Sequence, residues 1–117
     1  MSAPVVVHLP DLPPIPCPCG QARRSLMDSP QVPFSLHLTE ISQHAESHFH
    51  RNTTEVYVVL ECQPDSYLEI AEQKIALRPL TMVLIPPGAS HRLVGEAKVL
   101  IVANPKFDVA DEFLANS

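Results

Sequence analysis

The sequence lacks tryptophan, holds only three glycines, and has no apolar run longer than the five residues of Val56–Leu60 or Val99–Ala103. A helix that crosses a bilayer needs about 20 apolar residues, so we expect no membrane-spanning segment. Basic residues are also few, eight against 13 acidic ones, which gives a net charge of -5. This balance offers no positive field to a nucleic-acid backbone or an anionic membrane surface, so neither is an expected partner.

The N-terminus shows no basic segment followed by an apolar stretch, which is the pattern of an export signal, so we expect a cytoplasmic protein. Cysteine is scarce as well. Three cysteines, two of them in Cys17-Pro18-Cys19, make a poor disulfide framework. We therefore expect reduced thiols and assign the Cys17 and Cys19 pair no role.

Proline is abundant instead, and eight of the 13 prolines fall within the first 33 residues. Because proline interrupts ladder hydrogen bonding, residues 1–33 are predicted to form an arm, either free or along a sheet edge or a neighbouring subunit. Val5–Val7 is its only strand-like part. The remaining chain has enough apolar residues for one core, so we divide it into one domain over 34–105 and a C-terminal tail over 106–117.

Residues 34–105 have the pattern of short strands. Phe34, Leu36 and Leu38 alternate with polar residues, which is the period of a strand with two distinct faces. Runs rich in Val, Ile, Leu and Tyr follow at 55–62, 67–70, 74–77, 81–85, 91–94 and 98–103. No helical period precedes residue 108, so the pattern predicts an all-β antiparallel sandwich or barrel. A helical turn capped by Asp108 is expected near the C-terminus, with Phe113 docking.

The residues that point to chemistry lie in two clusters. In His48-Phe49-His50 the imidazoles are separated by one residue, so on a strand both point to the same face, about 7 Å apart at the backbone. That is near enough for them to share one metal ion. Glu55 follows a polar turn and opens the strongest predicted strand, which brings a carboxylate beside the two imidazoles.

The second cluster is Pro86-Pro87-Gly88-Ala89-Ser90-His91. The paired prolines end a strand, Gly88 permits a positive-φ turn, and His91 begins the next strand. A single histidine is more often a surface residue or a hydrogen-bonded core residue than a ligand. The joint pattern of three histidines and a glutamate at these spacings is rarely a coincidence.

The two clusters resemble the two motifs of the cupin superfamily. The first motif is matched at its ligand positions by His48, His50 and Glu55, and the centre of the second by Pro86, Gly88 and His91. The outer positions depart from the family, with Ser42, Cys62 and Leu80 in place of glycine and Gly95 in place of asparagine. These are turn and sheet-packing positions, so the departures affect strand boundaries more than the ligand set.

The resemblance, which covers roughly residues 34 to 103, implies a compact double-stranded β-helix, the cupin or jelly-roll barrel. It also implies that His48, His50, Glu55 and His91 bind one divalent metal. Three imidazoles and one carboxylate suit Fe, Mn, Ni, Cu or Zn, and the ligand types alone do not choose among these ions.

Two further residues are candidate catalytic groups beside that metal. Counting by twos from Glu55 places Tyr57 on the same side of its strand, where its hydroxyl can reach a substrate. The same parity makes Ser35, His37 and Thr39 a polar inner face, on which His37 is the better candidate for work beside the metal. The alternative for both Tyr57 and His37 is a purely structural role.

The function that these expectations favour is a metal-dependent enzyme acting on a small polar molecule. Oxygenation by a dioxygenase is the first hypothesis, because an octahedral ion with four protein ligands keeps two open positions. A redox-neutral isomerase or decarboxylase needs the same ligands, and a noncatalytic metal-binding or ligand-sensing module is the third alternative. Cupins commonly pair through their sheets, so the resemblance also implies a homodimer.

Overall fold

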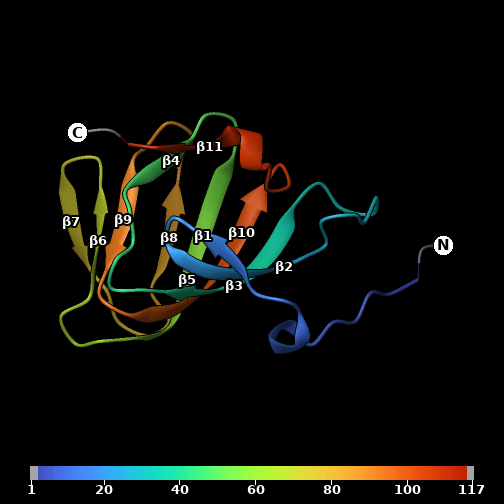
Figure 1. The fold of residues 1–117 in the computed structure, drawn as a ribbon, viewed down its shortest axis with the longest axis horizontal. Helices are drawn as coiled ribbons and strands as arrows, with labels where there is room; N and C mark the ends of the chain where they lie inside the picture. Colours follow the sequence, from blue (N-terminus) through green and yellow to red (C-terminus); the bar gives the residue numbers. More distant parts are fainter. Residues whose placement is uncertain (1–2, 116–117) are drawn as a thin grey trace.

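The computed structural model describes residues 3–115, which form two antiparallel sheets that face each other (Figure 1). The six-stranded sheet has the order β1 (Ile15–Cys17), β2 (Gly20–Ser25), β3 (Ser35–Ile41), β10 (Ala97–Asn104), β5 (Thr54–Cys62) and β8 (Met82–Ile85). The five-stranded sheet has the order β11 (Glu112–Leu114), β4 (His48–His50), β9 (His91–Val94), β6 (Tyr67–Ile70) and β7 (Gln73–Ala76).

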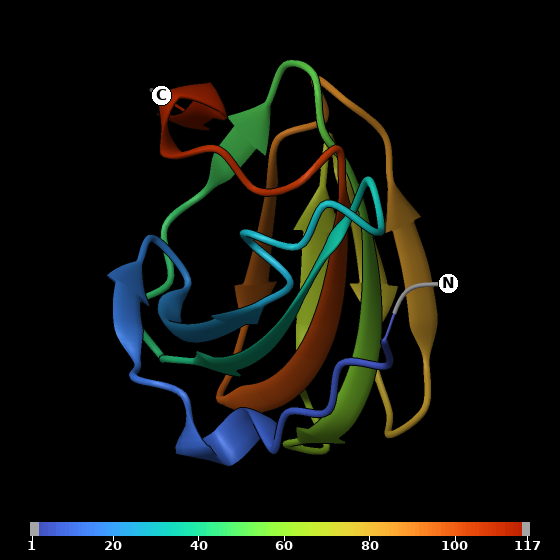
Figure 2. The ribbon, with the colours of Figure 1, turned by 90° about the vertical axis from the view of Figure 1, so that its right-hand side faces the viewer.

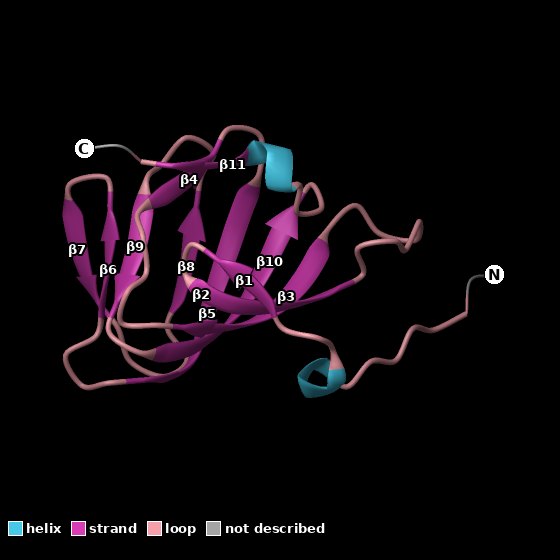
Figure 3. Cartoon of the chain, in the orientation of Figure 1, coloured by secondary structure: helices cyan, strands magenta, loops and turns pink. Residues whose placement is uncertain are grey.

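This arrangement confirms a mostly β chain with a cupin-like sandwich of two sheets (Figure 3). Closure into a complete barrel stays a prediction. Only two single turns of 3-10 helix, η1 (Leu9–Asp11) and η2 (Val109–Asp111), interrupt the strands of residues 3–115. Within that range no helix has the length and apolar character needed to cross a membrane.

The alternation expected for the inner strands is present. On β5 the buried residues are Glu55, Tyr57 and Val59, two apart, and Glu61 beyond them is exposed. Their strand is central, paired with β10 on one side and β8 on the other, so its backbone groups are satisfied along both edges. One face of β5 therefore passes from a carboxylate to a tyrosine to an aliphatic side chain.

The apolar core lies between the sheets, further along the same strands. Its most deeply buried aliphatic side chains are Val59, Leu68, Ile85 and Val99, each at most 2% exposed. Burial of each contributes about 1.5–3 kcal/mol relative to exposure. Leu68 comes from the five-stranded sheet and Val59 from the six-stranded sheet, so this core holds the two sheets together.

The proline-rich N-terminal segment contains more regular structure than the sequence suggests. Its strands are β1 and β2, whereas Val5–Val7 forms no strand and is exposed. Figure 1 shows the residues before η1 running away from the sheets. The hairpin requires Gly20, because a Cβ there would overlap the Glu40 carbonyl oxygen on the neighbouring strand β3.

The C-terminal segment closes over β4. The Asp108 carboxylate accepts a hydrogen bond from the Ala110 backbone N–H at 2.9 Å, so the expected capped turn forms, as 3-10 helix. β11 then pairs with β4, as Figure 2 shows, and the Phe113 ring stacks on Phe49 with centroids 5.4 Å apart. This contact faces away from the histidines of β4, because Phe49 alternates with them.

Candidate metal centre

Both sheets contribute to a cluster of four buried side chains. His48 and His50 come from β4, and His91 opens β9, where it pairs directly across from His48. Glu55 comes from β5 of the opposite sheet. All four are at most 5% exposed. The structure therefore brings together the four residues that the sequence motifs single out.

The donor atoms of this cluster are close enough to share an ion. One ligand atom from each residue lies within 4.8 Å of the others. Glu55 Oε1 is 3.3 Å from His50 Nε2 and 3.2 Å from His91 Nε2. Around an ion with bonds of about 2.1 Å, donors on opposite sides are about 4.2 Å apart. Inward shifts of a few tenths of an ångström would complete such a site.

The backbone fixes which nitrogen of each ring faces the centre. The Nδ1 atoms donate to carbonyl oxygens, at 3.2 Å from His48 to Glu46, 3.1 Å from His50 to Asp111 and 2.9 Å from His91 to Ala89. A carbonyl oxygen only accepts, so Nδ1 carries the proton in each neutral ring. The unprotonated Nε2 lone pairs are then the ones available to a metal, as in histidine-bound metal sites generally.

Three of the atoms that face the centre of the cluster make no hydrogen bond within the described residues. His50 Nε2, His91 Nε2 and Glu55 Oε1 are buried without a hydrogen-bond partner among residues 3–115. Two imidazole lone pairs and a carboxylate oxygen facing one another repel unless a proton or a metal cation lies between them. The orphaned acceptors and the mixed nitrogen and oxygen set therefore fit a divalent transition metal.

Burial and mutual contact set the protonation of these groups. Burial, with His91 nearby, lowers the pKa of His48 to about 4. Burial alone would lower the pKa of His50 and raise that of Glu55. The contact between His50 and Glu55 outweighs the effect of burial, so the pKa of His50 is raised and the pKa of Glu55 is lowered. His91 also contacts Glu55 and lowers the pKa of Glu55 further. Glu55 is thus a carboxylate at neutral pH.

Asp111 organises the turn between the ligand strands, and sequence analysis missed it. Its carboxylate accepts the backbone N–H groups of Arg51 and Asn52, each at 3.0 Å, and the Thr53 hydroxyl at 3.1 Å. These three residues belong to the segment 51–54 that separates His50 from Glu55. Because Asp111 lies about 60 residues away in sequence, no local signal points to its role.

A narrow hollow lies beside the ligands, with His48 and Glu55 in its wall. Its interior measures about 20 Å³, enough for about one water molecule. Its other polar lining residues are Arg24, His37, Thr39, Tyr57 and Glu112. The hollow is therefore a small polar space directly beside the ligand cluster.

The two predicted catalytic residues both reach this hollow. Tyr57 packs edge-on against the His91 ring with centroids 5.8 Å apart, and burial raises its pKa well above the usual tyrosine range. His37 lies 2.8 Å from the Ser35 hydroxyl through Nε2. Burial, and then the Arg24 charge, lower the pKa of His37 to about 4, so its imidazole is neutral at pH 7. Their catalytic roles stay predictions.

The Cys17-Pro18-Cys19 segment also borders the hollow, at the turn of the first hairpin. The structure joins Cys17 and Cys19 in a disulfide, so the expectation of reduced thiols is wrong for this pair. The tight turn at Pro18 and Cys19, between β1 and β2, brings the two sulfurs together, which the odd number of cysteines did not suggest. Cys62 is a free thiol.

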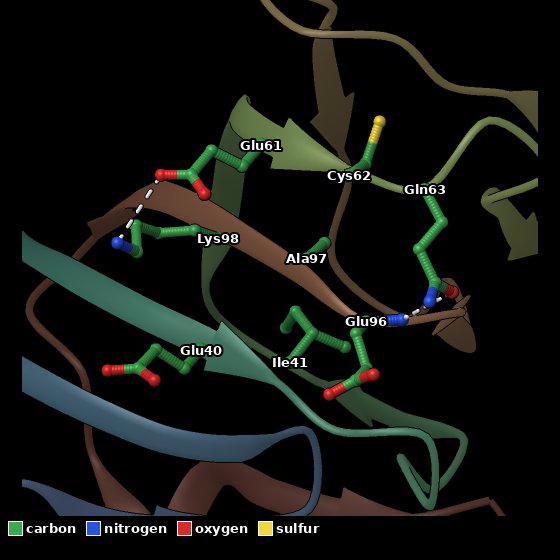
Figure 4. A pocket seen from close by; sticks show the side chains of 8 residues that line it. All are labelled: Glu40, Ile41, Glu61, Cys62, Gln63, Glu96, Ala97 and Lys98. Atoms are coloured by element: carbon green, nitrogen blue, oxygen red, sulfur yellow. Dashed lines mark hydrogen bonds and ion pairs between the residues drawn. The ribbon is translucent and has the colours of Figure 1, made fainter.

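A second hollow of about 380 Å³ lies elsewhere, where β3, β5 and β10 meet the turns around Gln63 and Glu96 (Figure 4). Its charged lining consists of Glu40, Glu61, Glu96 and Lys98. Lys98 contacts Glu61 at 3.4 Å. This hollow contains none of the four clustered ligands and is a surface feature apart from them.

Comparison with solved structures identifies the architecture. No family model and no curated protein matches the sequence. A protein from Planctomyces limnophilus is 36% identical, with a TM-score of 0.91 over 96% of this chain and 97% of that one. Pac13 from Streptomyces, a nucleoside dehydratase also solved with uridine, has a TM-score of 0.78 at 10% identity, covering 97% of this chain and 92% of its own.

Ectoine synthase from P. lautus has a TM-score of 0.77 at 20% identity, and the match covers 97% of this chain and 91% of that one. Pac13 and ectoine synthase are both cupin-fold proteins. Because the match to the Planctomyces limnophilus protein extends over nearly the whole of both chains, the shared fold includes β1, β2 and β11 as well as the motif strands.

Proposed function

Because the chain belongs to the cupin superfamily, we propose that it is an enzyme that holds one divalent transition metal on His48, His50, Glu55 and His91. The observation that carries this proposal is the set of three Nδ1–H groups tied to backbone carbonyls, which leaves three Nε2 lone pairs facing one carboxylate. A surface or core histidine has no need of that shared arrangement. Its substrate would be a small polar molecule, in keeping with the polar residues that line the hollow beside the ligands.

A bound ion would supply a Lewis acid that polarises a substrate oxygen. The chain itself provides groups that move protons beside it. His37 is neutral at pH 7 and can accept a proton, and burial raises the pKa of Glu112, with the neighbouring Glu55 adding to that rise. Tyr57 would orient the substrate through its hydroxyl. A Lewis acid with proton-transferring groups beside it favours a redox-neutral reaction, such as loss of water, isomerisation or decarboxylation.

Oxygenation is the second candidate. The interior of the hollow, at about 20 Å³, admits a molecule the size of water or dioxygen beside the ligand cluster. Turnover of a substrate in air but not under anaerobic conditions would favour a dioxygenase, and equal turnover in both would favour the redox-neutral reaction. Tight binding of a ligand without any product would instead indicate the noncatalytic, ligand-sensing module.

Metal content tests the common core of these alternatives. We expect tag-free protein to carry close to one metal ion per chain by elemental analysis, and the His50→Ala and His91→Ala variants to carry almost none. The matched control is His44→Ala, because His44 is exposed and lies outside the cluster. Equal metal in all four proteins would remove the basis of the proposal.

We also propose that the chain forms a homodimer. Strand β8 is an edge of the six-stranded sheet, and exposed apolar residues lie on it and just before it at Leu80, Met82 and Leu84. The exposed Val5–Val7 segment offers a second apolar surface. Such surfaces are often covered by another subunit. Light scattering of the purified chain measures the assembly directly. A cytoplasmic location also stays a prediction.

A further inference from the structure

Two adjacent arginines on β2 have different environments. Arg23 is satisfied, because its Nη1 contacts Glu40 Oε1 at 3.0 Å and its Nε donates to the Leu12 carbonyl oxygen at 3.0 Å. Arg24, one residue on, points to the other face of the strand and lines the hollow beside His48 and Glu55. Alternation along β2 thus sends one guanidinium outward and one toward the candidate metal centre.

The inward guanidinium lacks a hydrogen-bond acceptor for its Nε within residues 3–115. Arg24 Nε is buried without a hydrogen-bond acceptor, and among residues 3–115 no carboxylate lies within ion-pair distance of the Arg24 side chain. The guanidinium is stacked on the Phe107 ring, 3.8 Å from its centroid. Arg24 as a whole is half-buried, and its buried Nε lacks the hydrogen bond that water would supply, so a ligand that offers an acceptor there would be favourable.

The charge of the site favours an anionic ligand. Glu55 and Glu112 bring negative charge to the hollow, whereas Arg24 and a divalent ion bring positive charge. Even with Glu112 ionised, the sum is one net positive charge. A water molecule could accept from Arg24, but it would leave that positive charge uncompensated.

We propose that Arg24 binds a carboxylate group of the substrate, so that the enzyme acts on a small carboxylic acid in its anionic form. A carboxylate offers two acceptors that match the planar fork of a guanidinium, and it supplies the missing negative charge. The Phe107 ring holds the fork in place. This inference rests on the proposed function for the neighbouring metal, and it adds the substrate class and the residue that would recognise it.

Calorimetric titration of the zinc-loaded protein tests the inference, with lactate as the probe and lactamide as its neutral counterpart. We expect lactate to bind at least tenfold more tightly than lactamide. Arg24→Gln should lose at least tenfold in lactate affinity while keeping its zinc, and Arg24→Lys should lose less. Arg23→Gln, the matched control on the outer face, should bind lactate as the wild type does. Zinc content is measured in every protein.

The thermal midpoint separates recognition from a structural role. If Arg24 is kept for a ligand, Arg24→Gln removes an unsatisfied donor, and the ligand-free variant should melt no lower than the wild type. A lower midpoint, or unchanged lactate affinity in Arg24→Gln, would overturn the inference. Zinc-loaded wild type that does not bind lactate would also overturn the inference, although the metal proposal would then stand.

If the metal proposal fails, the wild-type protein will contain no bound zinc, and the zinc measurement shows this independently of lactate binding. In that case the same titrations on the metal-free chain decide the role of Arg24, because the guanidinium belongs to the chain itself. Lactate binding that disappears in Arg24→Gln would support carboxylate recognition. Absence of lactate binding in metal-free wild type would then overturn it.

Discussion

The two sheets contribute different chemistry to the same site. The five-stranded sheet supplies three imidazoles from β4 and β9, each held through Nδ1 by a backbone carbonyl. The six-stranded sheet supplies the Glu55 carboxylate and the lining residues Arg24 and His37. The comparison shows that one sheet presents a rigid set of lone pairs, while the other brings charge and proton carriers. An ion bound between them would link the sheets.

The largest expected effect follows from that link. Zinc at about 1,000 times its dissociation constant should raise the free energy of unfolding by about 4 kcal/mol, because the unfolded chain has no preformed site. His91→Ala should lose this gain, as urea titration with and without zinc will measure. Leu68→Ala should lower stability by about 3 kcal/mol through a core cavity yet keep the zinc gain. Equal zinc responses in both variants would contradict a link between the sheets.

A smaller effect concerns protonation on the six-stranded sheet. Metal-free His37 has a pKa of about 4, below the usual 6.5, so the unfolded chain takes up this proton first. The stability that His37 contributes is therefore present above pH 6.5 and is lost as the pH falls toward 4, by about 3 kcal/mol. Urea titrations in chelator at pH 7 and pH 4 should show a smaller loss for His37→Gln than for wild type.

Two other histidines bear on that measurement, which makes the comparison with wild type necessary. His48 also has a pKa of about 4, so the stability that it contributes is lost over the same pH range. The pKa of His50 is raised, so protonation of His50 stabilises the fold as the pH falls. Both are present in the wild type and in His37→Gln, so their effects cancel in the difference. His44→Gln serves as the exposed control, and a pH response of His37→Gln equal to that of wild type would refute the assignment.

The smallest expected effect tests the turn that joins the two ligand strands. Asp111→Asn keeps the size of the side chain but removes the charge that holds the N–H groups of Arg51 and Asn52. We expect zinc affinity to fall by about 10- to 100-fold, as for other residues that orient metal ligands. Competition with a coloured chelator measures this. Asp108→Asn, at the nearby helical cap, should leave zinc affinity unchanged.

The ligand cluster could be predicted from sequence because two short patterns carry it, and their resemblance to the cupin motifs implied that Glu55 and His91 join His48 and His50. Strand alternation places His48 and His50 on one face, and the turn at Gly88, with φ of +85°, delivers His91 to the start of β9. Even a departure from the motif is informative. Leu80, which replaces a glycine of the family pattern, keeps a positive φ of 73°, so the backbone shape persists without the residue that usually permits it.

The missed features depend on contacts that no short pattern encodes. Pro16 lies within β1, and a proline there is tolerated because β1 is at the sheet edge, where its absent N–H costs no ladder bond. The predicted arm therefore concealed the β1 and β2 hairpin, and with it the alternation that turns Arg24 inward. Asp111 was missed because its partners are brought to it only by the pairing of β11 with β4.

The direct pairing of His48 with His91 has a consequence for assembly of the fold. It is the single residue pair that joins β4 to β9, so the hydrogen-bonded ladder between these strands is minimal. A slip of β9 by one position would present Arg92 to the centre and turn His91 outward. A metal ion binds imidazoles and repels a guanidinium. Metal binding would thus favour the native register of β9 against β4 while the chain folds.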